Sequence, residues 1–126
     1  MNRDYHLGLL YFVHLLIDAD GVMDERELEA LKIVREREMI PGPVVEEFER
    51  NVRRKSEHDI YRTGLEFIDR CSHQEKLSIF STLYKLSEVD GRVHTKEIRL
   101  LLYSLRDAGM NFDEVVNSTR RTPSIL

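Results

Sequence analysis

One short motif occurs twice in the chain, and it constrains the fold more than any other feature. The segment DADGVMDEREL at 18–28 is repeated as EVDGRVHTKEI at 88–98, 70 positions later (Asp90 minus Asp20). Both copies share the pattern acid-x-Asp-Gly-x-apolar-x-x-x-Glu-apolar. Each copy follows a strongly apolar segment and precedes an amphipathic one. This arrangement predicts two related, pseudo-symmetric helical hairpins packed about an approximate two-fold axis.

Apolar residues recur at helical spacing along the chain, and strict two-residue alternation is absent. This pattern predicts an all-α fold of about seven helices. Segments 7–17 and 77–86 are the most apolar, so we expect them to be the two central helices. One-sided stripes mark the other five: Leu28, Leu31 and Val34; Val44, Val45, Phe48 and Val52; Ile60, Tyr61, Leu65 and Ile68; Ile98, Leu101, Leu102 and Leu105; Phe112, Val115 and Val116. The tyrosines are expected at the edge of the core: Tyr5, Tyr11, Tyr61, Tyr84 and Tyr103.

Capping residues, glycine and proline signal where the helices begin and end. Ser56, Ser72 and Asn111 each stand three positions before an acidic residue, as helix N-caps do. Pro41-Gly42-Pro43 is expected to end the second helix and to begin the third. Gly109 stands where a helix needs a left-handed residue at its C-terminal end.

Length and composition predict one globular domain. No connection is long enough to divide the 126 residues, so we expect a single domain over 1–126. Its core is expected at about 7–116, with a frayed tail at 120–126. Charged residues make up 33% of the chain, but the net charge is only -4. This balance argues against nucleic acid as a partner, because such proteins carry a surplus of Lys and Arg.

Cysteine use and the length of the apolar segments indicate a cytoplasmic protein. Cys71 is the single cysteine, so an internal disulfide is excluded and a reducing compartment is favoured. The apolar segment 7–17 is too short to cross a bilayer, which takes about 20 residues. We therefore expect no direct membrane insertion.

Helix capping explains much of the repeated motif. Gly21 and Gly91 allow the chain to reverse after a helix. Asp24 suits the N-cap of the next helix, and Glu27 completes a capping box three residues later. His94 and Glu97 hold the equivalent places in the second copy. A sound helix-turn-helix is therefore predicted without any ligand.

The remaining carboxylates indicate a cation. The turns do not need the pairs Asp18 with Asp20 and Glu88 with Asp90, and a hard divalent cation would relieve their mutual repulsion. The spacing also matches loop positions three to twelve of an EF-hand. Leu occupies position one in both copies, at 16 and 86. A degenerate, EF-hand-like calcium sensor is therefore one interpretation.

The two segments LLIDADGVMDERELEALKIV and LYKLSEVDGRVHTKEIRLLLYSL resemble the two halves of TerB-like domains. This family includes the tellurite-resistance protein TerB and the related cytoplasmic domain of a DnaJ-like co-chaperone. The resemblance covers about 7–108 and implies a non-enzymatic module in a stress or metal-resistance context. It also implies that acidic residues bind a divalent metal (Ca, Mg, Mn or Zn). The implied ligands are Asp18, Asp20, Asp24 and Glu27 in one half, and Glu88, Asp90 and Glu97 in the other.

This chain departs from the acidic family pattern in its second turn, where Arg92, His94 and Lys96 stand beside the carboxylates. The first turn is therefore the better metal candidate. His14 lies one helical turn before it and is interpreted as a core-boundary histidine, and Cys71 as structural. A metal-free module that binds a protein partner or forms a homodimer is the alternative. A carboxylate-based hydrolase is a third hypothesis, although no base or nucleophile is set against the carboxylates.

Overall fold

The computed structural model describes residues 3–17, 25–87 and 95–121. This part of the chain folds into seven α-helices without a strand, which confirms the predicted all-α class. The helices are α1 (Arg3–Ile17), α2 (Glu25–Arg37), α3 (Gly42–Val52), α4 (Glu57–Asp69), α5 (His73–Ser87), α6 (Thr95–Asp107) and α7 (Phe112–Thr119).

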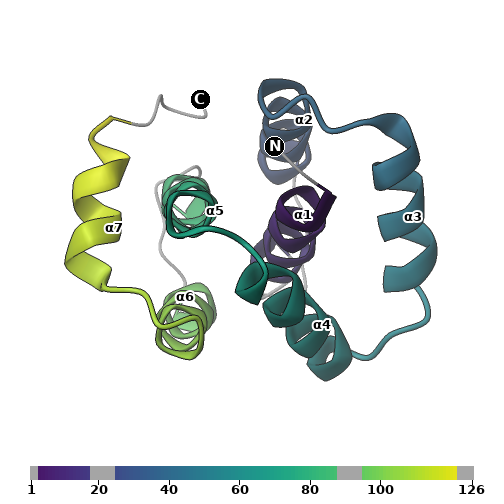
Figure 1. Ribbon diagram of the computed structural model, residues 1–126. Coiled ribbons are helices and arrows are strands. Elements are labelled where there is room, and N and C mark those ends of the chain that lie inside the picture. Colours follow the sequence, from purple (N-terminus) through teal and green to yellow (C-terminus); the bar gives the residue numbers. More distant parts are fainter. Residues whose placement is uncertain (1–2, 18–24, 88–94, 122–126) are drawn as a thin grey trace.

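Helices α1 and α5 form the centre of the molecule, as the sequence predicts. α1 packs against α3, α4, α5 and α6, whereas α5 packs against α1, α6 and α7. Figure 1 shows α1 and α5 side by side, with the other helices arranged around them. α1 is buried on nearly every side from Tyr5 to Ile17, because its apolar residues are not confined to one stripe. No helix in the described ranges has both the length and the apolar character of a membrane span.

The repeat is a unit of three helices, one more than the predicted hairpin. α1 and α5 begin 70 residues apart, at Arg3 and His73, and have the same length. The same offset of 70 relates the beginnings of α2 and α6 and of α3 and α7. In Figure 1, α2 and α6 lie at opposite ends of the central pair, and α3 and α7 lie on opposite sides. An approximate two-fold axis therefore passes between α1 and α5.

The N-caps predicted at Ser56, Ser72 and Asn111 are present, whereas the one predicted at Asp24 lies outside the described residues. The Ser72 hydroxyl accepts a hydrogen bond from the Glu75 N–H (3.1 Å), and the Glu75 carboxylate accepts one from the Ser72 N–H (2.9 Å). This reciprocal pair is a capping box at the start of α5. The Ser56 side chain caps α4 and the Asn111 side chain caps α7, each by accepting from the N–H three residues later. Local sequence signals therefore fix three helix starts.

The ends of α2 and α6 are built alike. Gly109 has a φ of 71°, as predicted, and Met39 at the equivalent position has a φ of 49°. In both turns the N–H of the left-handed residue bonds the carbonyl three residues back, and the next N–H bonds the carbonyl five back. α2 thus ends at Arg37, before the Pro-Gly-Pro segment that was expected to end it. Backbone hydrogen bonds stop the helix, and Pro41 serves as the N-cap of α3.

Within residues 3–17, 25–87 and 95–121 no helix is related to α4 by the offset of 70, and α4 packs closely on α1. A Cβ added to Gly64 would lie 2.7 Å from Cε2 of Phe12, and one added to Gly8 would lie 3.0 Å from Cγ1 of Ile68. These two glycines let the α1 and α4 backbones approach, because any side chain there would collide with the facing helix. Gly64 of α4 therefore faces the core directly.

Candidate functional site

The predicted metal ligands lie in two connections of equal length. Residues 18–24 join α1 to α2, and residues 88–94 join α5 to α6. Five predicted ligands lie in these connections, outside the described residues: Asp18, Asp20, Asp24, Glu88 and Asp90. Glu27 and Glu97 belong to the first turns of α2 and α6, but their side chains are outside the described part as well. The metal site therefore stays a prediction.

The described ranges contain no group of three or more His, Cys, Asp or Glu side chains placed to hold a metal ion. His14 packs its ring edge-on against Phe48, with 5.9 Å between the ring centroids. This contact fits the interpretation of His14 as a residue at the core boundary, because edge-to-face ring pairs stabilise packing.

Cys71 is a buried thiol beside the start of α5. Its Sγ donates to the Phe67 carbonyl at 3.4 Å. Burial raises the pKa of Cys71 to about 11, so the thiol stays protonated at neutral pH. Because the thiolate is the nucleophilic form, Cys71 has a structural environment and lacks the activation that a catalytic cysteine needs.

Tyr5 makes a polar contact in the middle of the core. Its hydroxyl donates to the Glu38 carboxylate (3.0 Å) and shares a hydrogen bond with the Ser78 hydroxyl (2.8 Å). Burial raises the pKa of Tyr5 well above its usual range, which keeps the phenol protonated. The contact links α1, α5 and the residue after α2. Tyr5 and Tyr11 are fully buried, so placing them at the edge of the core was wrong.

The clearest candidate surface is a stripe on α6 that the sequence analysis did not single out. Arg99, Leu102, Tyr103 and Arg106 follow i, i+3, i+4, i+7 spacing and are exposed on one side of the helix. Leu102 keeps 47% and Tyr103 keeps 52% of its surface exposed. The Arg106 guanidinium lies over the Tyr103 ring, 5.1 Å from its centroid. We name these four residues the α6 face.

Two expectations for this helix are therefore corrected. Leu102 was assigned to the core stripe of the sixth helix and Tyr103 to the edge of the core, but both are exposed. Leu101, Ser104 and Leu105 supply the buried side instead. Adjacent helical positions differ by about 100° around the axis, so Leu101 and Leu102 cannot both face inward fully. The regular spacing of two arginines around Leu102 and Tyr103 was the signal for a second, outward stripe.

A hydrogen bond beside the α6 face joins α4 to α6. The Tyr61 hydroxyl donates to Oδ2 of Asp107 at 2.5 Å. This bond, with the neighbouring Arg106 guanidinium, lowers the pKa of Asp107 below its ordinary value. Burial and the same carboxylate raise the pKa of Tyr61. α4 thus anchors one edge of α6.

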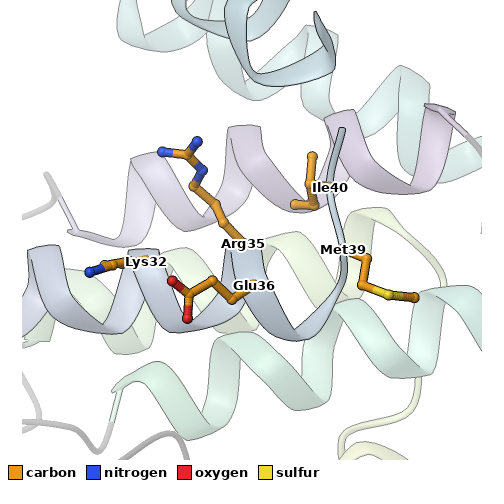
Figure 2. Close-up of a pocket in the computed structure, with 5 residues that line it drawn as sticks. All are labelled: Lys32, Arg35, Glu36, Met39 and Ile40. Atoms are coloured by element: carbon orange, nitrogen blue, oxygen red, sulfur yellow. The ribbon is translucent and has the colours of Figure 1, made fainter. Parts of the chain in front are cut away.

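A hollow of about 440 Å³ opens on α2, at the opposite end of the molecule from α6. Figure 2 shows Lys32 at one end of it, Arg35 and Glu36 in the middle, and Met39 and Ile40 at the other end. The Met39 side chain is 81% exposed. We name these five residues the α2 hollow. It combines two cations, one carboxylate and an apolar rim, and its volume lies near the lower end of ligand-pocket sizes, about 300–1,000 Å³.

Comparison of the chain with protein-family models, with curated proteins and with solved structures finds no match. The resemblance to TerB-like domains therefore rests on the two repeated motifs alone.

Proposed function

We propose that this chain is a non-enzymatic, TerB-like helical module that acts by binding a protein partner. The observation that carries the proposal is the α6 face. Two large apolar side chains, Leu102 and Tyr103, stand about half exposed between two arginines on a helix whose other side is buried. Exposed apolar groups rimmed by charge mark interaction sites, and Tyr and Arg are enriched where such sites contribute most binding energy.

The geometry of the α6 face suits binding. Arg106 stacks on the Tyr103 ring, which restricts the orientation of both side chains before a partner arrives. A side chain that is already ordered loses less entropy on association. The Tyr61–Asp107 hydrogen bond restrains the same end of α6. These contacts support a preorganised docking surface.

Site-specific photo-crosslinking tests the interaction. A benzophenone amino acid replaces Tyr103, and a matched variant carries it at Glu66, an exposed position on α4. We expect a discrete adduct from position 103 in the cells that make this protein, and none from position 66. Equal or absent crosslinking at both positions would overturn the assignment of the α6 face.

A second candidate function is divalent-cation binding at the acidic turns. It is supported by the equal length of the two connections and by the matched offset of the helices on either side of them. The carboxylates of the two copies therefore stand at equivalent points of the repeat. The first turn holds Asp18, Asp20, Asp24 and Glu27, and it lacks the basic residues that accompany Glu88, Asp90 and Glu97.

Thermal unfolding of EDTA-stripped protein tests this second function. Ca²⁺, Mg²⁺, Mn²⁺ and Zn²⁺ are added in turn to the natural chain and to Asp20→Asn/Glu27→Gln. A ligand at a hundredfold excess over its Kd stabilises a fold by about 2.7 kcal/mol. We expect one cation to raise the Tm of the natural chain and of the control Glu46→Gln/Glu49→Gln, but not of Asp20→Asn/Glu27→Gln. An unchanged Tm with all four cations at millimolar concentration counts against the site.

A further inference from the structure

The outer faces of α2 and α6 occupy equivalent positions in the two halves, and two pairs of equivalent exposed residues on them carry opposite charges. On α2 the exposed cations Lys32 and Arg35 lie between the two glutamates. Glu29 corresponds to Arg99 and Glu36 to Arg106 at the offset of 70, and all four side chains are exposed. On each helix the two charges are seven residues apart, which places them on one side about two turns from each other. A face with Glu at both ends complements a face with Arg at both ends in either helix direction.

Between these charged residues, the surface of α6 projects and the surface of α2 is hollow, so the two surfaces also complement each other in shape. On α6, Leu102 and Tyr103 project from the surface. On α2, the hollow is lined by apolar Met39 and by the cations Lys32 and Arg35. An apolar rim suits Leu102, and a cation suits the electron-rich face of an aromatic ring. The cations of the α2 hollow therefore favour an aromatic occupant such as Tyr103.

Met39 is an unusual residue for its position. Its left-handed backbone (φ 49°) is the conformation that Gly109 adopts at the equivalent turn in the second half. A side chain in this conformation costs about 1–2 kcal/mol, and glycine avoids that cost. The turn therefore does not need methionine, whose 81% exposed side chain adds apolar surface to the hollow. A docked partner would cover this surface.

The α6 face and the α2 hollow lie at opposite ends of the molecule, as the positions of α2 and α6 in Figure 1 show. They are too far apart to meet within one chain, but they can meet between two copies. In a docked pair, the α6 face of one copy and the α2 hollow of the other remain unoccupied. Such a contact is heterologous and repeats from copy to copy.

We propose, on the basis of the proposed function, that the partner of the α6 face is the α2 hollow of a second copy of this chain. Tyr103 and Leu102 of one copy enter the hollow of the next, and Arg99 and Arg106 pair with Glu29 and Glu36 there. Pairing of two α6 faces is disfavoured, because it would bring arginines of both copies together. A single helix-on-helix contact is small, so the association is weak and depends on protein concentration.

Sedimentation velocity of the full chain up to about 1 mM measures this association. One variant, Arg99→Glu/Arg106→Glu, makes both ends acidic, and another, Glu29→Arg/Glu36→Arg, makes both ends basic. The control Arg50→Glu/Arg54→Glu changes the net charge as the first variant does, but at exposed positions outside α2 and α6. Circular dichroism shows whether each variant is folded. If a charge variant is unfolded, Leu102→Ala is measured in its place.

We expect the natural chain and the control to form dimers and larger species as concentration rises. Each charge variant alone should associate at least about tenfold more weakly. An equimolar mixture of the two variants should associate again, because each acidic end then meets a basic one. A natural chain that stays monomeric at about 1 mM, or a mixture that does not recover association, overturns the head-to-tail contact.

The mass of the Tyr103 photo-adduct separates this inference from the proposed function. An adduct of two copies of this chain supports both. An adduct with a different protein overturns self-docking and leaves the interaction function standing. Absence of any adduct from position 103, both in cells and in the purified chain at about 1 mM, overturns both.

Discussion

The two halves of the molecule share one scaffold but differ at the surface. Some core positions related by the offset of 70 are apolar in both halves, as in Leu7 and Leu77 or Leu16 and Leu86, whereas others pair an apolar residue with a buried polar one, as in Phe12 and Thr82. Exposed positions related by the same offset can differ in charge, as in Glu29 and Arg99. The matched offset of the helices is kept although different side chains fill the two interiors. Partners can distinguish the halves by their exposed residues.

The halves also differ in how their central helices are covered. α1 is covered by α3, α4, α5 and α6, whereas α5 is covered by α1, α6 and α7. α4 lies in the chain between the two described sets of three repeated helices. It crosses α1 at Gly64 and reaches α6 through Tyr61. These contacts set the surroundings of α6 apart from those of α2.

The largest effect should come from emptying the equivalent centres of α1 and α5. Leu10 and Phe80 are both fully buried and are related by the offset of 70. Leu10→Ala and Phe80→Ala should each lower the free energy of unfolding by about 3–5 kcal/mol, because each leaves a cavity. Exposed Leu102→Ala, the control, should change it by less than about 0.5 kcal/mol. Urea unfolding measures all three, and a loss below about 1 kcal/mol at either core position would show that its helix is not central.

The next effect distinguishes α4 from the repeated helices. Gly64→Ala places a methyl group within 2.7 Å of the Phe12 ring. We expect a loss of about 1–3 kcal/mol from overpacking, despite the better helix propensity of alanine. Gly42→Ala, at the start of α3, meets no atom within 4 Å outside its chain neighbours. The following Pro43 disfavours a side chain in helical conformation at this position, so we expect a small loss, below that of Gly64→Ala. Equal melting temperatures for the two variants would contradict the close α1–α4 contact.

A smaller effect compares the two left-handed turns. Gly109→Met should destabilise the fold by about 1 kcal/mol, because a side chain enters a backbone conformation that glycine tolerates. Met39→Gly should stabilise it by about 0.5 kcal/mol, since the gain from relieved strain is partly offset by the entropy of glycine in the unfolded chain. Thermal unfolding of both variants gives the sign. If Gly109→Met raised the Tm or Met39→Gly lowered it, the two turns would not be equivalent.

The smallest effect depends on pH. The hydrogen bond from Tyr61 lowers the folded pKa of Asp107 below 3.8, its ordinary value. The stability from this bond is therefore fully present above about pH 4 and is lost as pH falls through the folded pKa. Tyr61→Phe should lower the urea midpoint at pH 6, and the difference from the natural chain should shrink toward pH 3. Tyr103→Phe, which alters an exposed ring on α6, should show no such trend.

Much of the fold could be predicted because its signals are local. Apolar spacing gave the seven helices, and the capping patterns at Ser56, Ser72 and Asn111 gave three of their starts. The left-handed turn at Met39, after the end of α2, was not predicted, because glycine is the residue expected in left-handed backbone and methionine is not. α4 was predicted as a helix, but its crossing of α1 at Gly64 depends on tertiary packing.

The candidate sites were harder to predict. Sequence reasoning led to the two acidic turns, whose duplication is visible without a structure. Leu102 and Tyr103 were assigned to the core or its edge, because an amphipathic helix with apolar residues on adjacent positions has no unique inward face. Only the packing of α6 against α5 and α1 decides which side of α6 is exposed. The α2 hollow likewise depends on where α2 ends and α3 begins.

The short connection between α4 and α5 has a consequence for concentrated solutions. Only Arg70, Cys71 and Ser72 separate the two helices, and the approximate two-fold axis lies between α1 and α5. In a domain-swapped pair, the first half of one chain would pack on the second half of another and remake the contacts of α1 with α5 and α6, while the connection that contains the buried Cys71 would extend. Such domain swapping gives a closed dimer that stops at two chains, whereas a head-to-tail contact keeps adding copies.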